Sequence, residues 1–321
     1  MLTLVRVVAA LTAVAFSAVV HAQAFPSKPL RLVVPFPPGA GTDMFARVLA
    51  HKLSETLGQP VVVDNRPGGG AIIGTDIVAK SPPDGYTLLL STTSHAINPS
   101  VYSKLPYDTL RDFATVTQVA TVPIVLVVHP SLPVTTAQEL VAFARSRPGQ
   151  LNVGSSSSGT VFHLAAELLK STAGIDMVHV PFKGGSPALA ALLANQVNVL
   201  FETSLTVGPQ AKAGKLRPLA VGGLKRSSAM PELPTLAESG FPGFSAENWY
   251  GVYVPAGTPR EIVKRLNRDI VNALGQPDVR ERFASQGAEL IGNTPEQHEE
   301  FLKAEMAKWA RIARLADAHA D

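Results

Sequence analysis

Cysteine is absent from the 321-residue sequence, and charged residues are scarce. The missing cysteine excludes disulfide scaffolds, thiolate zinc sites, thiol nucleophiles and iron–sulfur clusters. Charged residues make up 17% of the chain, below the roughly 25% of typical soluble domains. Lysine and arginine form no run, and the formal net charge is only +3. The sequence therefore predicts no nucleic-acid partner, because it lacks the basic patch that binding to phosphates requires.

Hydrophobic residues are plentiful, at 46% of the chain, and 26 residues are proline. A disordered chain would have few apolar residues and a high net charge, so that class is excluded. At roughly 100–200 residues per domain, the length predicts two domains with room for a buried core. The composition indicates a moderately basic, proline-rich globular protein.

Residues 1–24 predict a secretory signal peptide. Arg6 is the only charged residue before Lys28, and the apolar run Val7–Val20 is shorter than the roughly 20 residues of a spanning helix. Small residues in an A-x-A pattern follow at Ala22–Ala24, with Val20–Ala22 as a competing cleavage site. The alternative is a buried N-terminal helix. Without a cysteine at the cleavage site, the mature protein is expected to be exported, soluble and not lipidated.

Short β-rich runs alternate with helical patterns through the mature chain. Strands are expected at 30–34, 61–63, 86–90, 124–128, 151–153, 177–180, 197–201 and 218–221. Helices are expected at 42–57, 72–80, 137–146, 162–171, 187–193, 259–274 and from about 295 onward. This alternation predicts an α/β fold with βαβ units and mainly parallel sheets. The last helix carries an apolar stripe that predicts docking onto a core: Leu302, Met306, Trp309 and Ala313.

Three loops rich in glycine, serine and proline connect a strand to a helix, within 33–45, 153–164 and 180–189. Each delivers free backbone N–H groups to the positive end of a helix, where anionic oxygens bind without a charged side chain. Facing one crevice, such loops would make a carboxylate or phosphate site. The alternative is that glycine and serine only form tight turns between strand and helix.

Nucleotide and enzyme motifs are incomplete in this sequence. The segment Gly154–Thr160 has P-loop spacing, but Thr160 stands where the phosphate-binding lysine belongs. The sequence has no G-x-S-x-G elbow and no H-E-x-x-H pair. Asp43 and His163 could serve as general bases, but a helix-stabilising acid and a packed histidine are the simpler interpretations. Lys183 is the best-placed cation for an anionic ligand, with a solvated loop lysine as the alternative.

Short motifs then follow one another in the order found in one family. They are Val34–Asp43, Arg66–Gly70, Pro83–Leu88, His95–Pro99, Leu105–Asp108, Asp112–Phe113, the serine loop with His163 and Leu164, Phe182–Gly184, Lys212–Arg217 and Val254–Pro259. From about Phe25 to the C-terminus, the sequence resembles the Bug family, the periplasmic solute receptors of tripartite tricarboxylate transporters. Two departures are that Ala40 replaces the more usual glycine, and that Glu202 follows Phe201 where aspartate is common.

The resemblance implies a two-lobed type II periplasmic-binding-protein fold, each lobe a mainly parallel sheet flanked by helices. Lobe one would comprise residues 25–123 and 250–321, and lobe two residues 124–249, with the ligand cleft between them. The chain would cross between the lobes near 122–124 and 248–250. A soluble α/β hydrolase or transferase using Asp43 and His163 is the alternative from another functional class.

The resemblance also implies a small carboxylate ligand: a dicarboxylate, a tricarboxylate, an aromatic acid or an amino acid. The residues that match the family's binding motifs are Phe36, Ala40, Gly41, Thr42, Asp43, Ser91, Thr92, Thr93, Ser94, Ser156, Ser157, Thr160, His163, Lys183, Gly184 and Glu202. No cofactor or metal is expected, and the protein is expected to be a monomer. Its partners would be the membrane components of a tripartite tricarboxylate transporter, or a membrane sensor kinase. Glu202 is a candidate to pair with a ligand ammonium, which would favour amino acids.

Overall fold

The computed structural model describes residues 25–39, 41–285 and 287–320. Its strands are Leu30–Val34 (β1), Val61–Asn65 (β2), Thr87–Thr92 (β3), Phe113–Val128 (β4), Asn152–Ser155 (β5), Val178–Pro181 (β6), Val199–Thr203 (β7), Arg217–Val221 (β8), Glu247–Pro255 (β9) and Glu289–Leu290 (β10). Its helices are Gly41–Leu57 (α2), Ile72–Ala79 (α3), Ser94–Val101 (α4), Ala137–Arg145 (α5), Val161–Ala173 (α6), Gly185–Leu193 (α7), Ser204–Lys212 (α8), Arg260–Leu274 (α9), Pro277–Ala284 (α10) and Pro295–Leu315 (α11).

The strands form one mixed sheet in the order β2-β1-β3-β9-β4-β7-β5-β6, with β8 and β10 also paired to β4. The predicted βαβ units are parallel, since β1 pairs with β2 and β3, and β5 pairs with β6 and β7. The long strands β4 and β9 run antiparallel to their neighbours. The sheet is therefore parallel on both sides and antiparallel in the middle.

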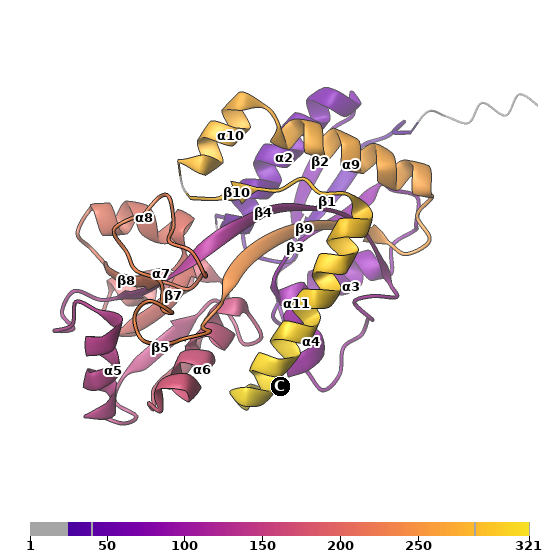
Figure 1. Cartoon of the computed structure of the whole chain (residues 1–321). Coiled ribbons are helices and arrows are strands. Elements are labelled where there is room, and N and C mark those ends of the chain that lie inside the picture. Colours follow the sequence, from indigo (N-terminus) through magenta and orange to yellow (C-terminus); the bar gives the residue numbers. More distant parts are fainter. Residues whose placement is uncertain (1–24, 40, 286, 321) are drawn as a thin grey trace, which may run out of the picture.

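Strand β4 changes its partner along its length. Residues Phe113–Pro123 pair with β9, whereas Ile124–Val128 pair with β7. In Figure 1, β4 and β9 run between two groups of helices, with α5 to α8 on one side and α2, α3, α4, α9 and α10 on the other. These two strands link the two groups.

Some elements were not predicted from the sequence. Helices α4 and α8 contain Pro99 and Pro209, which argue against a helix interior because proline lacks the backbone N–H. Strand β9, the first half of β4 and helix α10 were also missed. The first helix begins at Gly41, one residue before the predicted start at Thr42, so Thr42 lies inside its first turn.

Helix α11 docks on the core through the stripe predicted for it. Leu302, Trp309 and Ala313 are buried, and Met306 packs partly buried against the same cluster. The helix contacts α4 and also α6 on the other side of the molecule (Figure 1). The Ser171 hydroxyl at the end of α6 donates a hydrogen bond of 3.1 Å to the carbonyl of Leu315. The C-terminal helix therefore bridges both groups of helices.

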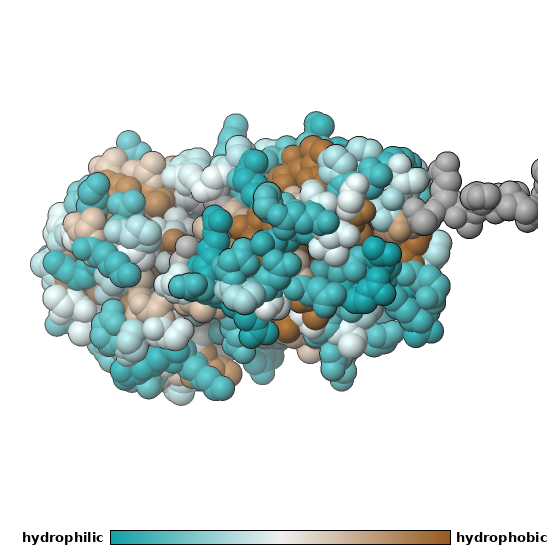
Figure 2. All heavy atoms as spheres, turned by 90° about the horizontal axis from the view of Figure 1, so that it is seen from above, coloured by the Kyte–Doolittle hydropathy of each residue, from teal (hydrophilic) through white to brown (hydrophobic). Residues whose placement is uncertain are grey.

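The predicted signal peptide, residues 1–24, and Ala40 lie outside the described residues. Of the helices within the described ranges, none is long and apolar enough to cross a membrane. On the face shown in Figure 2, hydrophobic residues form small, separate patches among hydrophilic ones.

Candidate functional site

Five helices begin at one cavity in the middle of the molecule. The first residues of α2, α4, α6 and α7 line it, namely Gly41, Ser94, Val161 and Gly185, and Thr203 lines it just before α8. The space that the centres of water molecules can occupy in this cavity is about 30 Å³. The cavity therefore has room for about two waters. Its lining residues are Phe36, Gly41, Thr42, Thr92, Ser94, Ser156, Thr160, Val161, Phe162, Gly185, Glu202, Thr203, Asn248 and Tyr250.

The N-cap side chains at four of these helix starts leave the first-turn donors uncapped, although the Ser94 amide donates a hydrogen bond of 3.3 Å to the Thr92 hydroxyl. The N-cap residues described for four of the helices make no side-chain capping hydrogen bond: Thr93, Thr160, Gly184 and Thr203. By contrast, Thr136 caps α5 and Thr294 caps α11, away from the cavity. First-turn N–H groups and the positive ends of the helix dipoles are thus directed at one small space, which favours an anion.

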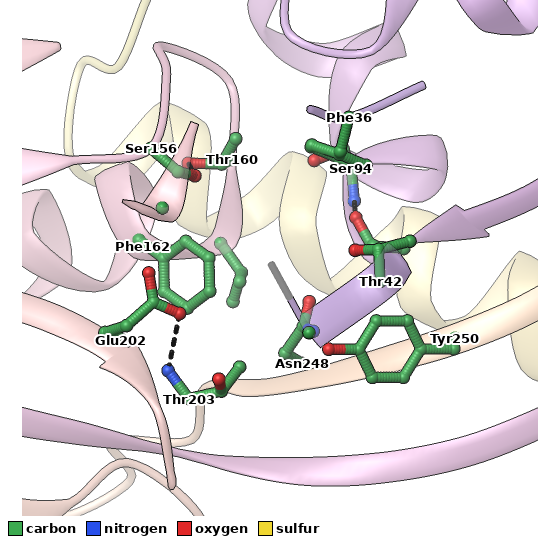
Figure 3. Close-up of a pocket in the computed structure, with 14 residues that line it drawn as sticks. Phe36, Thr42, Ser94, Ser156, Thr160, Phe162, Glu202, Thr203, Asn248 and Tyr250 are labelled. Carbon is green, nitrogen blue, oxygen red and sulfur yellow. Dashed lines mark hydrogen bonds between the residues drawn. The ribbon is translucent and has the colours of Figure 1, made fainter. Parts of the chain in front are cut away.

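Eight residues predicted from the sequence line this cavity: Phe36, Gly41, Thr42, Thr92, Ser94, Ser156, Thr160 and Glu202. Figure 3 shows Thr42 and Ser94 on one side and Thr160 and Glu202 on the other, with Asn248 between them. Residues from distant parts of the chain therefore meet here, as the shared-site interpretation of the loops requires.

A second, wider groove adjoins the cavity. It has a volume of about 500 Å³ and shares Phe36 and Ser156 with the cavity. Three further predicted residues, Ser157, Lys183 and Gly184, line this groove rather than the cavity. Lys183 is exposed to solvent, so it faces the outer part of the site.

Asp43 is buried but is not among the residues that line the cavity. Its carboxylate accepts hydrogen bonds from the Gly39 amide at 3.0 Å, the Arg47 guanidinium at 2.8 Å and the Asn65 amide at 3.1 Å. Burial opposes ionisation, but the hydrogen bonds, the strongest from Arg47, outweigh it and lower the Asp43 pKa. Asp43 therefore holds the first loop in shape as an ionised group, and it is not poised as a general base.

His163 also supports a loop rather than lining the cavity. Its Nδ1 accepts a hydrogen bond of 3.3 Å from the Gly159 amide, and its ring stacks on His179 with centroids 4.1 Å apart. Burial, followed by the charges of His179 and Lys170, lowers the His163 pKa to about 3. The imidazole is therefore neutral and packed, which agrees with the simpler interpretation of its sequence position.

Ser91 and Thr93 are buried on β3 and just after it, outside the cavity lining. The Thr93 hydroxyl accepts a hydrogen bond of 3.0 Å from the Trp249 amide and lies 3.3 Å from the Glu247 carbonyl. Thr93 thus fastens the start of α4 to β9.

Glu202 is the one carboxylate among the described lining residues, and it is 4% exposed. Its Oε1 accepts a hydrogen bond of 2.8 Å from the Thr203 amide, whereas Oε2 has no partner. Burial raises the Glu202 pKa to about 7. No lysine, arginine or histidine lies among the described lining residues, so this acid has no cationic partner in the cavity.

Sequence reasoning missed six lining residues: Val161, Phe162, Gly185, Thr203, Asn248 and Tyr250. The Tyr250 hydroxyl lies next to the side chains of Thr42 and Asn248, which favour its ionised form less than burial opposes it. The only sequence signal for Asn248 and Tyr250 was the predicted crossing near 248–250. Because β9 reaches the cavity from the far end of the chain, no local pattern identifies its side chains as part of the site.

The arrangement is suited to holding an anion by backbone and hydroxyl groups. The lining offers hydroxyls from Thr42, Ser94 and Thr160, and apolar walls from Phe36 and Phe162. The two candidate bases for an enzymatic reaction, Asp43 and His163, are both committed to supporting loops. The cavity therefore favours binding over turnover.

Comparison with known proteins gives a family and a set of structural neighbours. The model of the tripartite tricarboxylate transporter family receptor matches residues 45–317. Protein BugT of Bordetella pertussis is 42% identical over 300 residues, which cover 93% of this chain and 92% of BugT. R. palustris Rpa4515 with adipate has a TM-score of 0.89 at 40% identity, covering 92% of this chain and 99% of Rpa4515. MatC from Rhodopseudomonas palustris with bound malate has a TM-score of 0.85 at 31% identity, covering 90% of this chain and 99% of MatC.

Proposed function

The chain belongs to the tripartite tricarboxylate transporter receptor family, and we propose that it captures a small carboxylate for uptake by such a transporter. Members of this family are periplasmic solute-binding receptors with a two-lobed α/β fold, not enzymes. The observation that carries the proposal is the convergence of five helix starts on a cavity whose described lining contains no cation. Structural neighbours hold adipate and malate, which supports a carboxylate of that class here.

Ligand contacts are proposed at two levels of the site. In the cavity, one carboxylate would meet the backbone and hydroxyl groups of Gly41, Thr42, Ser94 and Thr160. In the adjoining groove, Lys183 would attract a second anionic group if the ligand is long enough. Asp43, Thr93 and His163, and the buried Ser91, are proposed to support the site from behind.

The two lobes are proposed to divide at the crossing strands, with residues 25–123 and 250–321 in one and 124–249 in the other. The support is that β4 exchanges β9 for β7 as its partner between Pro123 and Ile124. Closure of the lobes around the ligand would then be the signal that the membrane components read. Residues 1–24 are proposed to be removed as a signal peptide when the protein is exported to the periplasm.

A thermal-shift screen tests the proposed function. Dicarboxylates, tricarboxylates, aromatic acids and amino acids are added with and without a chelator. A ligand that binds only the folded state adds about 2.7 kcal/mol at 100 times its dissociation constant, which raises the melting temperature by at least about 2 °C. Thr42→Ala should reduce the shift, and Ser146→Ala, on the far end of α5, should not. A shift produced by nucleotides or divalent metals but by no carboxylate would refute the proposal.

A further inference from the structure

The carboxyl group of Glu202 is directed into the cavity without a partner for one of its oxygens. Oε2 lies 2.6 Å from the position that a Cβ atom would take on Gly185, the first residue of α7. It therefore lies directly over the start of that helix. Figure 3 shows the group on the cavity wall, with its other oxygen on the Thr203 amide. A buried oxygen without a partner is costly, so the site is complete only when something else in the cavity binds it.

No cation that could serve as this partner comes from the neighbouring elements that the structure describes. Tyr250 on β9 faces the acid, and burial, followed by the charge of Glu202, raises its pKa above the usual range, so it is a neutral phenol. Asp43 on α2 is an anion bound to Arg47. On the strand partner β4, the residue opposite Glu202 is the apolar Val125.

The remaining titratable groups near this side of the cavity are neutral or face away. His163 on α6 stacks on His179 of β6, and burial lowers the pKa of both, to about 3 and about 4. Lys183, in the loop before α7, lines the outer groove and is exposed. The first residues of α8 carry no charge.

An ionised Glu202 and an ionised ligand carboxylate cannot share this cavity at low cost. Two carboxylates in one buried site repel each other, and the usual result is that one of them holds a proton. We propose that Glu202 is a specificity-determining residue that binds the ligand carboxylate in its protonated form, donating an O–H hydrogen bond, so that capture of one anion takes up one proton from solvent. This inference rests on the proposed function, since it concerns the same ligand.

The burial of Glu202 brings the pKa of its carboxyl group into the physiological pH range. With a pKa of about 7 in the empty protein, the acid is mostly protonated at pH 6 and mostly ionised at pH 8. A bound anion raises the pKa further. Affinity should therefore be constant below about pH 6.5 and fall by up to tenfold per pH unit above pH 7, about 100-fold between pH 6 and pH 9.

A ligand ammonium is another group that could satisfy Oε2. The two possibilities make opposite demands, because the ammonium requires an ionised Glu202 and the proposed contact requires a protonated one. Malate and aspartate distinguish them, since they share a carbon skeleton and differ in a hydroxyl and an ammonium group. An ammonium partner predicts affinity for aspartate that rises with pH through 7.

The test is isothermal titration calorimetry of the full mature protein with malate, adipate, succinate, benzoate and aspartate between pH 6 and 9. Each titration is run in two buffers of different ionisation enthalpy, which gives the number of protons taken up. We expect close to zero protons at pH 6 and about 0.9 at pH 8 for the carboxylates that bind. Over the same pH range, the dissociation constant should rise together with the number of protons taken up.

Two variants separate Glu202 from general effects of pH. Glu202→Gln keeps the shape and a neutral donor, so its affinity should be nearly independent of pH and exceed the wild-type affinity at pH 9. Glu247→Gln is the matched control, because burial also raises the pKa of Glu247 but its side chain lies outside the cavity lining. This control should keep the wild-type pH profile.

Three experimental outcomes would each contradict a different part of these proposals. Carboxylate binding that is independent of pH in the wild type, with no proton uptake, would overturn the role of Glu202 and leave the proposed function standing. Tight binding of aspartate alone, lost in Glu202→Gln, would replace the proton with an ammonium partner. Binding of none of these acids at pH 6 would overturn both proposals together.

Discussion

The hydroxyl oxygen of Tyr250 lies 2.8 Å from the position that a Cβ atom would take on Gly41. The start of α2 and strand β9 therefore meet at a point with no room for a side chain. The same hydroxyl lies next to the side chains of Thr42 and Asn248. This contact joins the first loop to β9, and these two parts of the site are more than 200 residues apart in the sequence.

Gly41→Ala should weaken ligand binding and destabilise the protein. The new methyl group would push Tyr250 away from Thr42, at a cost of about 1–3 kcal/mol in unfolding free energy. The measurement is urea unfolding together with ligand titration. Tyr250→Phe in the same chain removes the clashing oxygen, so the double variant should regain part of the stability lost in Gly41→Ala. If the double variant is no more stable, the clash is not the cause.

Lys183→Ala should affect ligands with two anionic ends more than ligands with one. Lys183 is exposed and lines the outer groove, where an ion pair contributes about 0.2–1 kcal/mol. We expect adipate to bind about two- to fivefold more weakly, and hexanoate, which has the same length but one carboxylate, to be unchanged. Lys215→Ala, another exposed lysine, is the control. An equal loss for adipate and hexanoate would exclude a distal ion pair.

Glu202→Gln should stabilise the empty protein at alkaline pH. Burial raises the pKa of Glu202 from its ordinary 4.5 to about 7, so the folded state holds the proton more tightly than the unfolded state. The wild type therefore loses stability as pH rises from about 4.5 through 7, by up to about 3 kcal/mol. Unfolding followed by circular dichroism at pH 5 and pH 8 should show a gain for Glu202→Gln that is larger at pH 8. A gain of the same size at both pH values would contradict this linkage.

Glu305→Ala should destabilise the fold without changing the ligand affinity of the folded protein. The Glu305 carboxylate accepts hydrogen bonds of 2.9 Å from the indole N–H groups of both Trp249 and Trp309. Its loss leaves two buried donors unpaired, at a cost of about 3 kcal/mol. Glu305→Gln retains an acceptor and should cost less than half as much. Differential scanning calorimetry measures the loss, and equal losses in both variants would rule out the shared acceptor as its source.

The βαβ units of the fold were predictable from sequence because their signals are local. Strand β1 and helix α2, for example, follow from an apolar run, a glycine-rich turn and an amphipathic repeat. Strand β9 was not found, since its residues Glu247, Asn248 and Trp249 have no simple alternation and are fixed by pairing with distant strands. The prolines inside α4 and α8 hid those helices, whose stability comes from packing.

For the site, the motif residues of the glycine- and serine-rich loops could be placed because loop chemistry is visible in the sequence. The sequence did not show which of these residues line the cavity and which only support the loops. Asp43 and His163 have the residue types of a catalytic pair, yet hydrogen bonds to Arg47 and Gly159 use them as loop supports. Tyr250 enters the site through tertiary packing alone.

The indole pair that shares Glu305 also gives the protein an intrinsic optical reporter. Trp249 and Trp309 are the only tryptophans in the chain, and Trp249 stands between two residues that line the cavity, Asn248 and Tyr250. A shift of β9 on ligand capture would change the surroundings of Trp249 and therefore its emission. Fluorescence without any added label should therefore follow the capture of a solute in real time.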